Sequence, residues 1–229
     1  MLPIFIISHD RYTVLRMLIN RLTQLGQERI IIVDNASTYE PLLQYYSEIE
    51  NQFEIIRMDK NWGPGVLAIF YDMLKNRYQL DKINFMYTDP DVIPVEECPK
   101  DFPEIFEEIL KKYPVEKVGF SLKIDDLPDH YRFKYNVLCW ESSLWRNKFY
   151  DDDLNLDLYK APIDTTFSYR RANTVPGLCK AKACYRVGHP YMARHLTWYI
   201  DSRNPSEEDQ YYADRTVGFS YYLANHMLQ

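Results

Sequence analysis

Short apolar runs alternate with segments of helical spacing along the first half of the chain. The runs cover residues 3–8, 29–34, 54–58 and 83–87, and their length and apolar content predict buried strands. Leucines at positions 15, 18, 22 and 25 predict a helix over 12–25 that ends at Gly26. Further helices are predicted over 41–50 and 66–78. Strand, helix and strand thus follow one another three times with short joins.

Such repeats favour right-handed crossovers and parallel strands that are covered on both sides. The pattern therefore predicts an α/β fold of Rossmann type, with a mixed, mostly parallel sheet and helices on both faces. In sheets of this kind, ligands bind beyond the carboxyl ends of the strands.

The pattern is less regular after residue 95. A helix over 100–113 and a strand over 117–123 are predicted, whereas 136–145 fits either a strand or a helix. Residues 206–209 read Ser-Glu-Glu-Asp, which is typical of a capped helix start, and this helix is predicted to run to about residue 226. The acidic run 151–153 is interpreted as a solvated loop, because consecutive carboxylates rarely converge on one metal ion.

Polar residues follow each of the first three strands at their carboxyl ends. They are Ser8, His9 and Asp10 after the first strand, Asp34, Asn35, Ala36 and Ser37 after the second, and Asn61, Gly63 and Gly65 after the third. Asp34 is a candidate acceptor for a base N–H, and the two glycines would let the backbone approach a phosphate in front of a helix. The alternatives are a helix-entry turn at 34–37 and a plain loop at 63–65.

The fourth strand ends in two carboxylates, Asp89 and Asp91, separated by Pro90. Proline stops the strand from continuing as a central ladder member, so both carboxylates are predicted to lie at its tip. Two carboxylates this close repel each other unless a cation or hydrogen-bond donors keep them ionised. Mg²⁺ or Mn²⁺ meets that need and completes its shell with water and phosphate oxygens. The alternative is a type I turn with no bound ion.

Composition limits the kinds of partner and location that fit this chain. With 229 residues, 46% of them hydrophobic, the chain is long enough for one large α/β domain. The formal net charge of −6 argues against a nucleic-acid partner held through phosphate contacts. Four cysteines without a C-x-x-C pair are interpreted as reduced thiols of a cytoplasmic protein. The apolar start of seven residues is too short for a signal peptide or a transmembrane segment.

Three of these stretches resemble a known family. They are the run Ile-Ile-Ile-Val-Asp-Asn-Ala-Ser over 30–37, Asn61-x-Gly63, and the strand that ends in Asp89-Pro90-Asp91. Together they resemble the nucleotide-sugar-binding half of glycosyltransferases of the GT-A fold, particularly the inverting family 2 group. The resemblance covers about the first 95 residues. It implies a nucleotide-sugar-binding half at 1–95 and an acceptor-binding half at 96–229 within one domain.

The resemblance also implies roles for individual residues. The predicted substrate contacts are Ser8, His9, Asp34, Asn35, Asn61, Gly63, Asp89, Trp140 and Arg194. The resemblance puts Asp34 on the base and Asp89 near the ribose, whereas Trp140 is a candidate for stacking on a sugar or base and Arg194 is a candidate phosphate contact. The implied metal ligands are Asp91, Asp89 and His195. Asp164 is the implied catalytic base, with Glu141 as the second choice. The chain departs from the family at Ser8-His9-Asp10, where the usual residues are a small one, Tyr and Asn, and at Ile163, where the family usually has an acid.

These features predict a glycosyltransferase that depends on Mn²⁺ or Mg²⁺ and inverts the anomeric configuration. The expected donor is a nucleoside-diphosphate sugar, with UDP-sugars favoured, and the expected acceptor is a glycan or glycolipid hydroxyl in polysaccharide biosynthesis. The expected location is the cytoplasm or the periphery of a membrane. Two alternatives stay open, a phosphohydrolase of the haloacid-dehalogenase type and a non-catalytic nucleotide-sugar binder.

Overall fold

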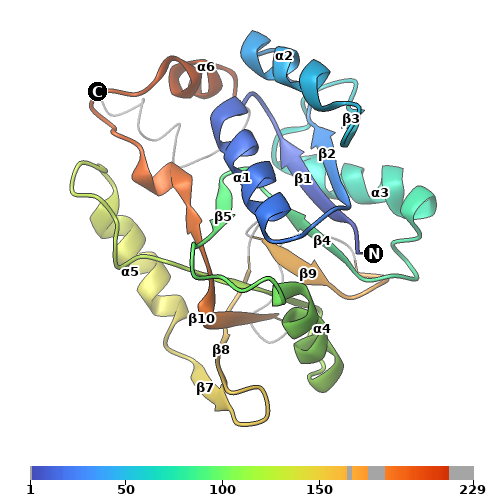
Figure 1. Ribbon diagram of the computed structural model, residues 1–229. Helices are drawn as coiled ribbons and strands as arrows, with labels where there is room; N and C mark the ends of the chain where they lie inside the picture. Colours follow the sequence, from blue (N-terminus) through green and yellow to red (C-terminus); the bar gives the residue numbers. More distant parts are fainter. Residues whose placement is uncertain (1, 164–166, 175–183, 217–229) are drawn as a thin grey trace.

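A computed structural model describes residues 2–163, 167–174 and 184–216 (Figure 1). In chain order its elements are β1 (Ile4–Ser8), α1 (Tyr12–Gln24), β2 (Ile30–Asp34), α2 (Glu40–Ile49), β3 (Glu54–Arg57), η1 (Gly63–Gly65), α3 (Val66–Tyr78), β4 (Phe85–Thr88), β5 (Val92–Pro94), α4 (Phe102–Lys112), β6 (Lys117–Leu122), α5 (Lys134–Leu144), β7 (Lys148–Asp151), β8 (Leu156–Lys160), β9 (Ser168–Arg170), β10 (Cys184–His195), η3 (Leu196–Tyr199) and α6 (Glu207–Arg215).

One sheet runs through the described part of the molecule, in the order β3-β2-β1-β4-β9-β6-β10-β8-β7, with β5 paired to β10. Strands β3, β2, β1 and β4 are parallel, so their carboxyl ends share one edge. In the rest of the sheet, as far as the described residues form it, β6 and β10 are parallel neighbours and the remaining pairs are antiparallel. The predicted mixed α/β sheet is confirmed, with its parallel part concentrated in the first half.

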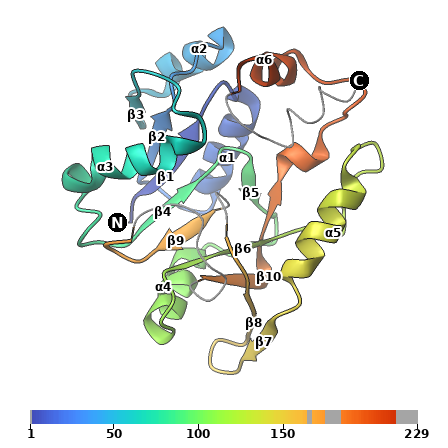
Figure 2. The ribbon, with the colours of Figure 1, turned by 180° about the vertical axis from the view of Figure 1, so that it is seen from behind.

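Helices cover both faces of the sheet, as the two views show (Figures 1 and 2). Alternate residues of β1 and β2 point to opposite sides. Ile4, Ile6, Ile30 and Ile32 pack in one core with residues of α1, α2 and α4. Phe5, Ile7, Ile31 and Val33 pack in a second core with α3. The complete burial of these two strands explains why they read as continuous apolar runs.

Strand β9 joins the two parts of the sheet. It lies antiparallel between β4 and β6, with Ser168 opposite both Tyr87 and Gly119. A Cβ atom at Gly119 would lie 2.4 Å from the carbonyl oxygen of Phe167. Only glycine therefore allows the chain at Phe167 to approach β6 this closely.

Strand β10 brings the far end of the chain back to the parallel half. Its first residues pair with β6 and β8, its register on β6 shifts between Val187 and Met192, and its last residues pair with β5. In the last pairing Arg194 lies opposite Ile93 and His195 lies opposite Val92. The pairing places His195 beside the Asp-Pro-Asp segment.

Several sequence predictions need correction. The segment whose pattern fits either a strand or a helix is the helix α5. The last predicted helix is present as α6, and the part of its predicted span over 217–226 lies outside the described residues. Asp151 is not part of a solvated loop: it ends β7, is buried, and pairs with Lys112 at 2.7 Å, although Asp153 is exposed. Cys184 is disulfide-bonded, so it is not a reduced thiol, whereas Cys98 and Cys139 are free. No helix of the described residues is long and apolar enough to span a membrane.

Candidate functional site

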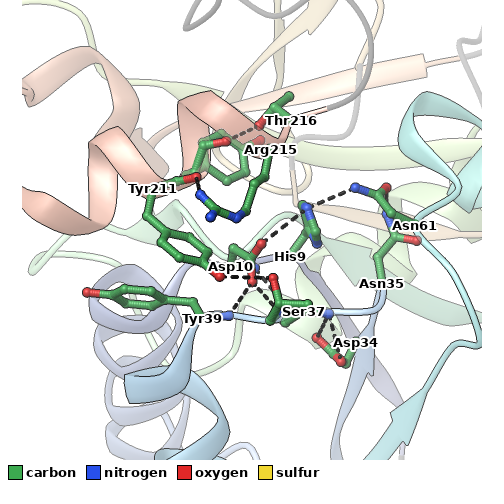
Figure 3. Close-up of polar contacts among 12 residues, drawn as sticks. His9, Asp10, Asp34, Asn35, Ser37, Tyr39, Asn61, Tyr211, Arg215 and Thr216 are labelled. Atoms are coloured by element: carbon green, nitrogen blue, oxygen red, sulfur yellow. Dashed lines mark hydrogen bonds and ion pairs between the residues drawn. The ribbon is translucent and has the colours of Figure 1, made fainter.

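The loops after β1, β2 and β3 are tied together by side-chain amides at the carboxyl edge of the sheet (Figure 3). Asn35 donates from Nδ2 to Oδ1 of Asn61 at 2.9 Å and accepts from the backbone N–H of Trp62 at 2.9 Å. Nδ2 of Asn61 lies 2.8 Å from Nε2 of His9, and Oδ1 of Asn61 accepts from the N–H of Gly63 at 2.7 Å. The structure thus brings together four of the residues that the sequence predicts to bind the donor.

Asp10 fixes the loop after β2. Its Oδ1 accepts from the N–H groups of Thr38 at 2.6 Å and Tyr39 at 2.8 Å, and its own N–H donates to Oγ of Ser37 at 2.9 Å. Asp10 and Ala36 both have positive φ, 49° and 58°, which costs energy in residues other than glycine. The two loops hold each other in these conformations at the edge where ligands of parallel sheets bind.

Asp34 is fully buried and is surrounded by donors. Its oxygens accept from Nε of Arg57 at 3.0 Å, the hydroxyl of Tyr46 at 3.1 Å and the N–H of Ser37 at 3.2 Å. Burial, and then the neighbouring charge of Asp34, raise the pKa of Tyr46 well above its usual value. In this structure the base of a nucleotide could hydrogen-bond to Asp34 only after displacing one of these donors.

Asp91 meets His195 at the tip of β4. Its Oδ2 lies 3.5 Å from Nε2 of His195 and also accepts from the hydroxyl of Thr197, while its carbonyl accepts from the N–H of Leu196 at 2.7 Å. Burial favours a higher pKa for Asp91, but the charges of His195 and Arg11 and the Thr197 hydroxyl outweigh it and lower that pKa. Asp91 is therefore held ionised.

The donor set around Asp91 fits a small divalent ion. One carboxylate and one imidazole nitrogen are present, and Nδ1 of His195 is buried with no hydrogen-bond partner among the described residues. Within the part of the chain that the structure describes, no three His, Cys, Asp or Glu side chains converge as a metal centre. Ions such as Mg²⁺ and Mn²⁺ commonly take one or two protein ligands and complete their shell with substrate phosphates and water. Two protein ligands are sufficient for that role.

Comparison with known proteins adds partial likenesses in fold. No protein-family model matches the sequence, and no curated protein matches it either. A cytidylyltransferase from Leptospira borgpetersenii serovar Hardjo-bovis is 11% identical, with a TM-score of 0.37 and 55% of each chain covered. This chain thus spans about half the length of that protein. A protein described as a glucose-1-phosphate thymidylyltransferase from Bacillus anthracis is 10% identical, with a TM-score of 0.39, and covers all of this chain and 79% of its own. Likenesses this partial do not extend to function.

Three other predicted site residues, Glu141, Trp140 and Arg194, pair with partners other than Asp91 and His195 or are exposed. Glu141 is buried on α5 and pairs with Nη1 of Arg186 at 2.8 Å, so its carboxylate neutralises a buried cation. Trp140 is 59% exposed on the same helix. Arg194 pairs with Glu96 at 2.6 Å and with Asp126 at 2.8 Å. Asp164, the predicted base, lies outside the described residues.

Sequence reasoning missed Arg11, Thr197 and Tyr212 as neighbours of the site. Cζ of Arg11 lies 5.0 Å from the ring centre of Tyr212, a residue of α6. The ring of Tyr212 is 6.3 Å from that of His9. Burial, and to a smaller degree the negative charges of Asp91 and Asp89, raise the pKa of Tyr212. Arg11 could have been found because it follows His9 and Asp10 in the sequence, and Thr197 because it lies two residues after His195. Nothing in the sequence pointed to Tyr212.

Proposed function

We propose that this chain is a metal-dependent glycosyltransferase that uses a nucleoside-diphosphate sugar. The observation that carries the proposal is the meeting of Asp91 with His195, 3.5 Å apart, at the carboxyl edge of four parallel strands. The neighbouring loops of His9, Asn35 and Asn61 support a nucleotide site at the same edge. UDP-sugars are the favoured donors, and a glycan or glycolipid hydroxyl is the proposed acceptor.

The residues of the chain would divide the work as follows. Asp91 and His195, with Asp89 beside them, would hold Mn²⁺ or Mg²⁺, which supplies positive charge for the diphosphate as it leaves. His9, Asn35 and Asn61 would orient the nucleoside. Asp164 would accept the proton of the acceptor hydroxyl as that oxygen attacks the anomeric carbon from the face opposite the diphosphate, which inverts the configuration.

A phosphohydrolase of the haloacid-dehalogenase type is the second candidate, with Asp89 as its nucleophile. In that group the nucleophilic strand generally comes first in the chain, whereas here β1, β2 and β3 precede β4. The third candidate, a binder without turnover, would keep the same donor site. Replacing Asp164 separates it from the enzyme, because a base is needed for transfer but not for nucleotide binding.

The proposal is tested by calorimetric titration of nucleoside-diphosphate sugars with Mn²⁺ and then with EDTA. We expect one donor to bind with Mn²⁺ and to lose at least tenfold in affinity with EDTA or in Asp91→Asn, because a charge-assisted contact is lost. The matched control is Asp129→Asn, since the side chain of Asp129 is 99% exposed and pairs with Lys134. A donor affinity that is the same with EDTA and in Asp91→Asn as in the wild type with Mn²⁺ would contradict a metal role for Asp91.

A further inference from the structure

Helix α6 lies over the carboxyl edge where the donor is proposed to bind (Figures 1 and 3). The hydroxyl of Tyr211 is 3.0 Å from Oγ1 of Thr38, and its ring centre is 4.8 Å from that of Tyr39. The next residue, Tyr212, packs near His9 and Arg11. The helix therefore contacts both the β1 loop and the β2 loop of the candidate site.

The acidic first turn of α6 reaches the start of α1. Glu208 is buried, and its carboxylate accepts from the N–H of Thr13 at 3.0 and 3.1 Å and from the hydroxyl of Thr13 at 2.7 Å. Arg11 lies 3.8 Å from Glu208 and 3.8 Å from Asp209. The Glu208 carboxylate thus pairs with Arg11 and with the N–H of Thr13 at the start of α1. Helix α1 itself has no side-chain cap and no acidic residue in its first turn.

The candidate donor residues are largely covered in this arrangement. The exposed fraction of the side chain is 15% for His9, 13% for Asp91 and 24% for His195. A nucleoside diphosphate must make contact with such groups over much of its surface. Tyr212 of α6 lies beside one of them, with its ring 6.3 Å from that of His9, so a nucleoside diphosphate that contacts His9 would compete with α6 for this position.

We propose that α6 is an autoinhibitory cover of the donor site, held closed by the Glu208 carboxylate, and that a nucleoside diphosphate binds by displacing it. The inference rests on the proposed function. The diphosphate and Glu208 compete for the same positive groups, since both are anions that suit Arg11 and a helix N-terminus.

The composition of the contact fits a helix that can leave. Two residues of α6, Glu208 and Ala213, are buried, and among the described residues its side-chain contacts with the body include hydrogen bonds, ion pairs and tyrosine rings. Helices with few buried apolar contacts open locally at a small cost compared with the global free energy of unfolding. The capping box of Ser206 and Asp209 keeps the helix formed by itself, with Asp209 N donating to Ser206 Oγ at 3.1 Å.

The test compares three proteins by calorimetry with UDP and Mn²⁺: the wild type, Glu208→Gln and Glu207→Gln. Glu208→Gln keeps the shape of the side chain and removes one of the two carboxylate charges that lie 3.8 Å from Arg11. We expect it to bind UDP about tenfold more tightly, because a larger fraction of molecules is open before binding. Glu207→Gln is the matched control, since Glu207 lies in the same turn and is exposed. We expect it to change the affinity by less than about twofold.

Hydrogen exchange of the α6 amides in the wild type provides a second readout that does not depend on any variant folding. We expect UDP with Mn²⁺ to speed exchange over residues 207–215. Slower exchange there would mean that α6 closes over the ligand, which overturns the displacement. Equal UDP affinity of wild type and Glu208→Gln would also overturn it while leaving the proposed donor site in place. Absence of UDP binding to both proteins would instead remove the donor site, and the inference with it.

Discussion

Asp34 shows how one side chain can serve the architecture of a site. It is fully buried at the end of β2 and collects donors from three segments: Tyr46 of α2, Arg57 of β3 and the loop at Ser37. A buried carboxylate is tolerated only when its oxygens are paired in this way. Asp34 therefore fixes where α2 and β3 stand relative to the loop that carries Asn35. A role in base recognition remains a prediction.

Removing one of these donors is expected to destabilise the fold. In Tyr46→Phe the buried carboxylate loses a hydrogen bond and no water replaces it, so we expect the free energy of unfolding to fall by about 1–3 kcal/mol. Urea unfolding measures this. Tyr45→Phe is the control: Tyr45 is also buried, packs on Tyr12 at 5.3 Å, and its hydroxyl has no hydrogen-bond partner among the described residues. An equal loss in both variants would assign the effect to the rings rather than to Asp34.

At the scale of elements, the passage of the chain into β9 depends on one glycine. Strand β9 separates β4 from β6, and the carbonyl of Phe167 occupies the space where a side chain of residue 119 would stand. The half of the sheet that carries Asp91 and the half that carries His195 are joined through this strand. The two backbones approach so closely here that residue 119 must lack a side chain, because neither strand can move away without breaking hydrogen bonds of the sheet.

Gly119→Ala is therefore expected to lower the free energy of unfolding by about 1–3 kcal/mol or more, through overpacking against backbone. Gly65→Ala is the matched control. Gly65 has a helical φ of −74°, and a Cβ atom there would meet nothing within 4 Å. We expect Gly65→Ala to unfold at the same urea concentration as the wild type or a higher one. A tolerated Gly119→Ala would show that β9 can shift away from β6.

At the scale of the whole molecule, Asp151 ties the β7–β8 hairpin to the end of α4. Its carboxylate pairs with Lys112 at 2.7 Å and accepts from the hydroxyl of Tyr113 at 2.6 Å and the N–H of Leu154 at 3.1 Å. Burial opposes ionisation, yet these partners outweigh it and lower the pKa of Asp151 from 3.8 to about 2. The ionised form is the one that the fold stabilises.

The sign of the pH dependence follows from this shift. Because the folded pKa lies below the unfolded one, Asp151 contributes to stability above pH 3.8, and the contribution is lost as the pH falls towards about 2. With allowance for solvent around Lys112, we expect about 1 kcal/mol. Urea unfolding at pH 6 and pH 2.5 should show a smaller acid loss in Asp151→Asn than in the exposed control Asp152→Asn. Equal acid losses would contradict the role of Asp151.

The parallel half of the fold was predictable because its strands are buried on both faces and its helices have clear periodicity. The polar loops followed from the same pattern, since parallel strands place their ends together. The second half depends on contacts that no local pattern encodes. Strand β9 has three residues, β10 changes register, and the acids of α6 have partners in α1 and the preceding loop. The link between Asp91 and His195 could be stated from family resemblance, but the pairing of β5 with β10 that creates it could not.

The pairing of β5 with β10 determines which substitutions and truncations would break the contacts of Asp91. Asp91 and Thr197 lie 106 positions apart, and His195 stands opposite Val92 because β10 returns to pair with β5. A chain truncated after residue 95 would keep Asp89 and Asp91 but would lack His195 and Thr197, which contact Asp91. Substitutions that disturb β10 would therefore separate His195 and Thr197 from Asp91 without changing either acid of the motif.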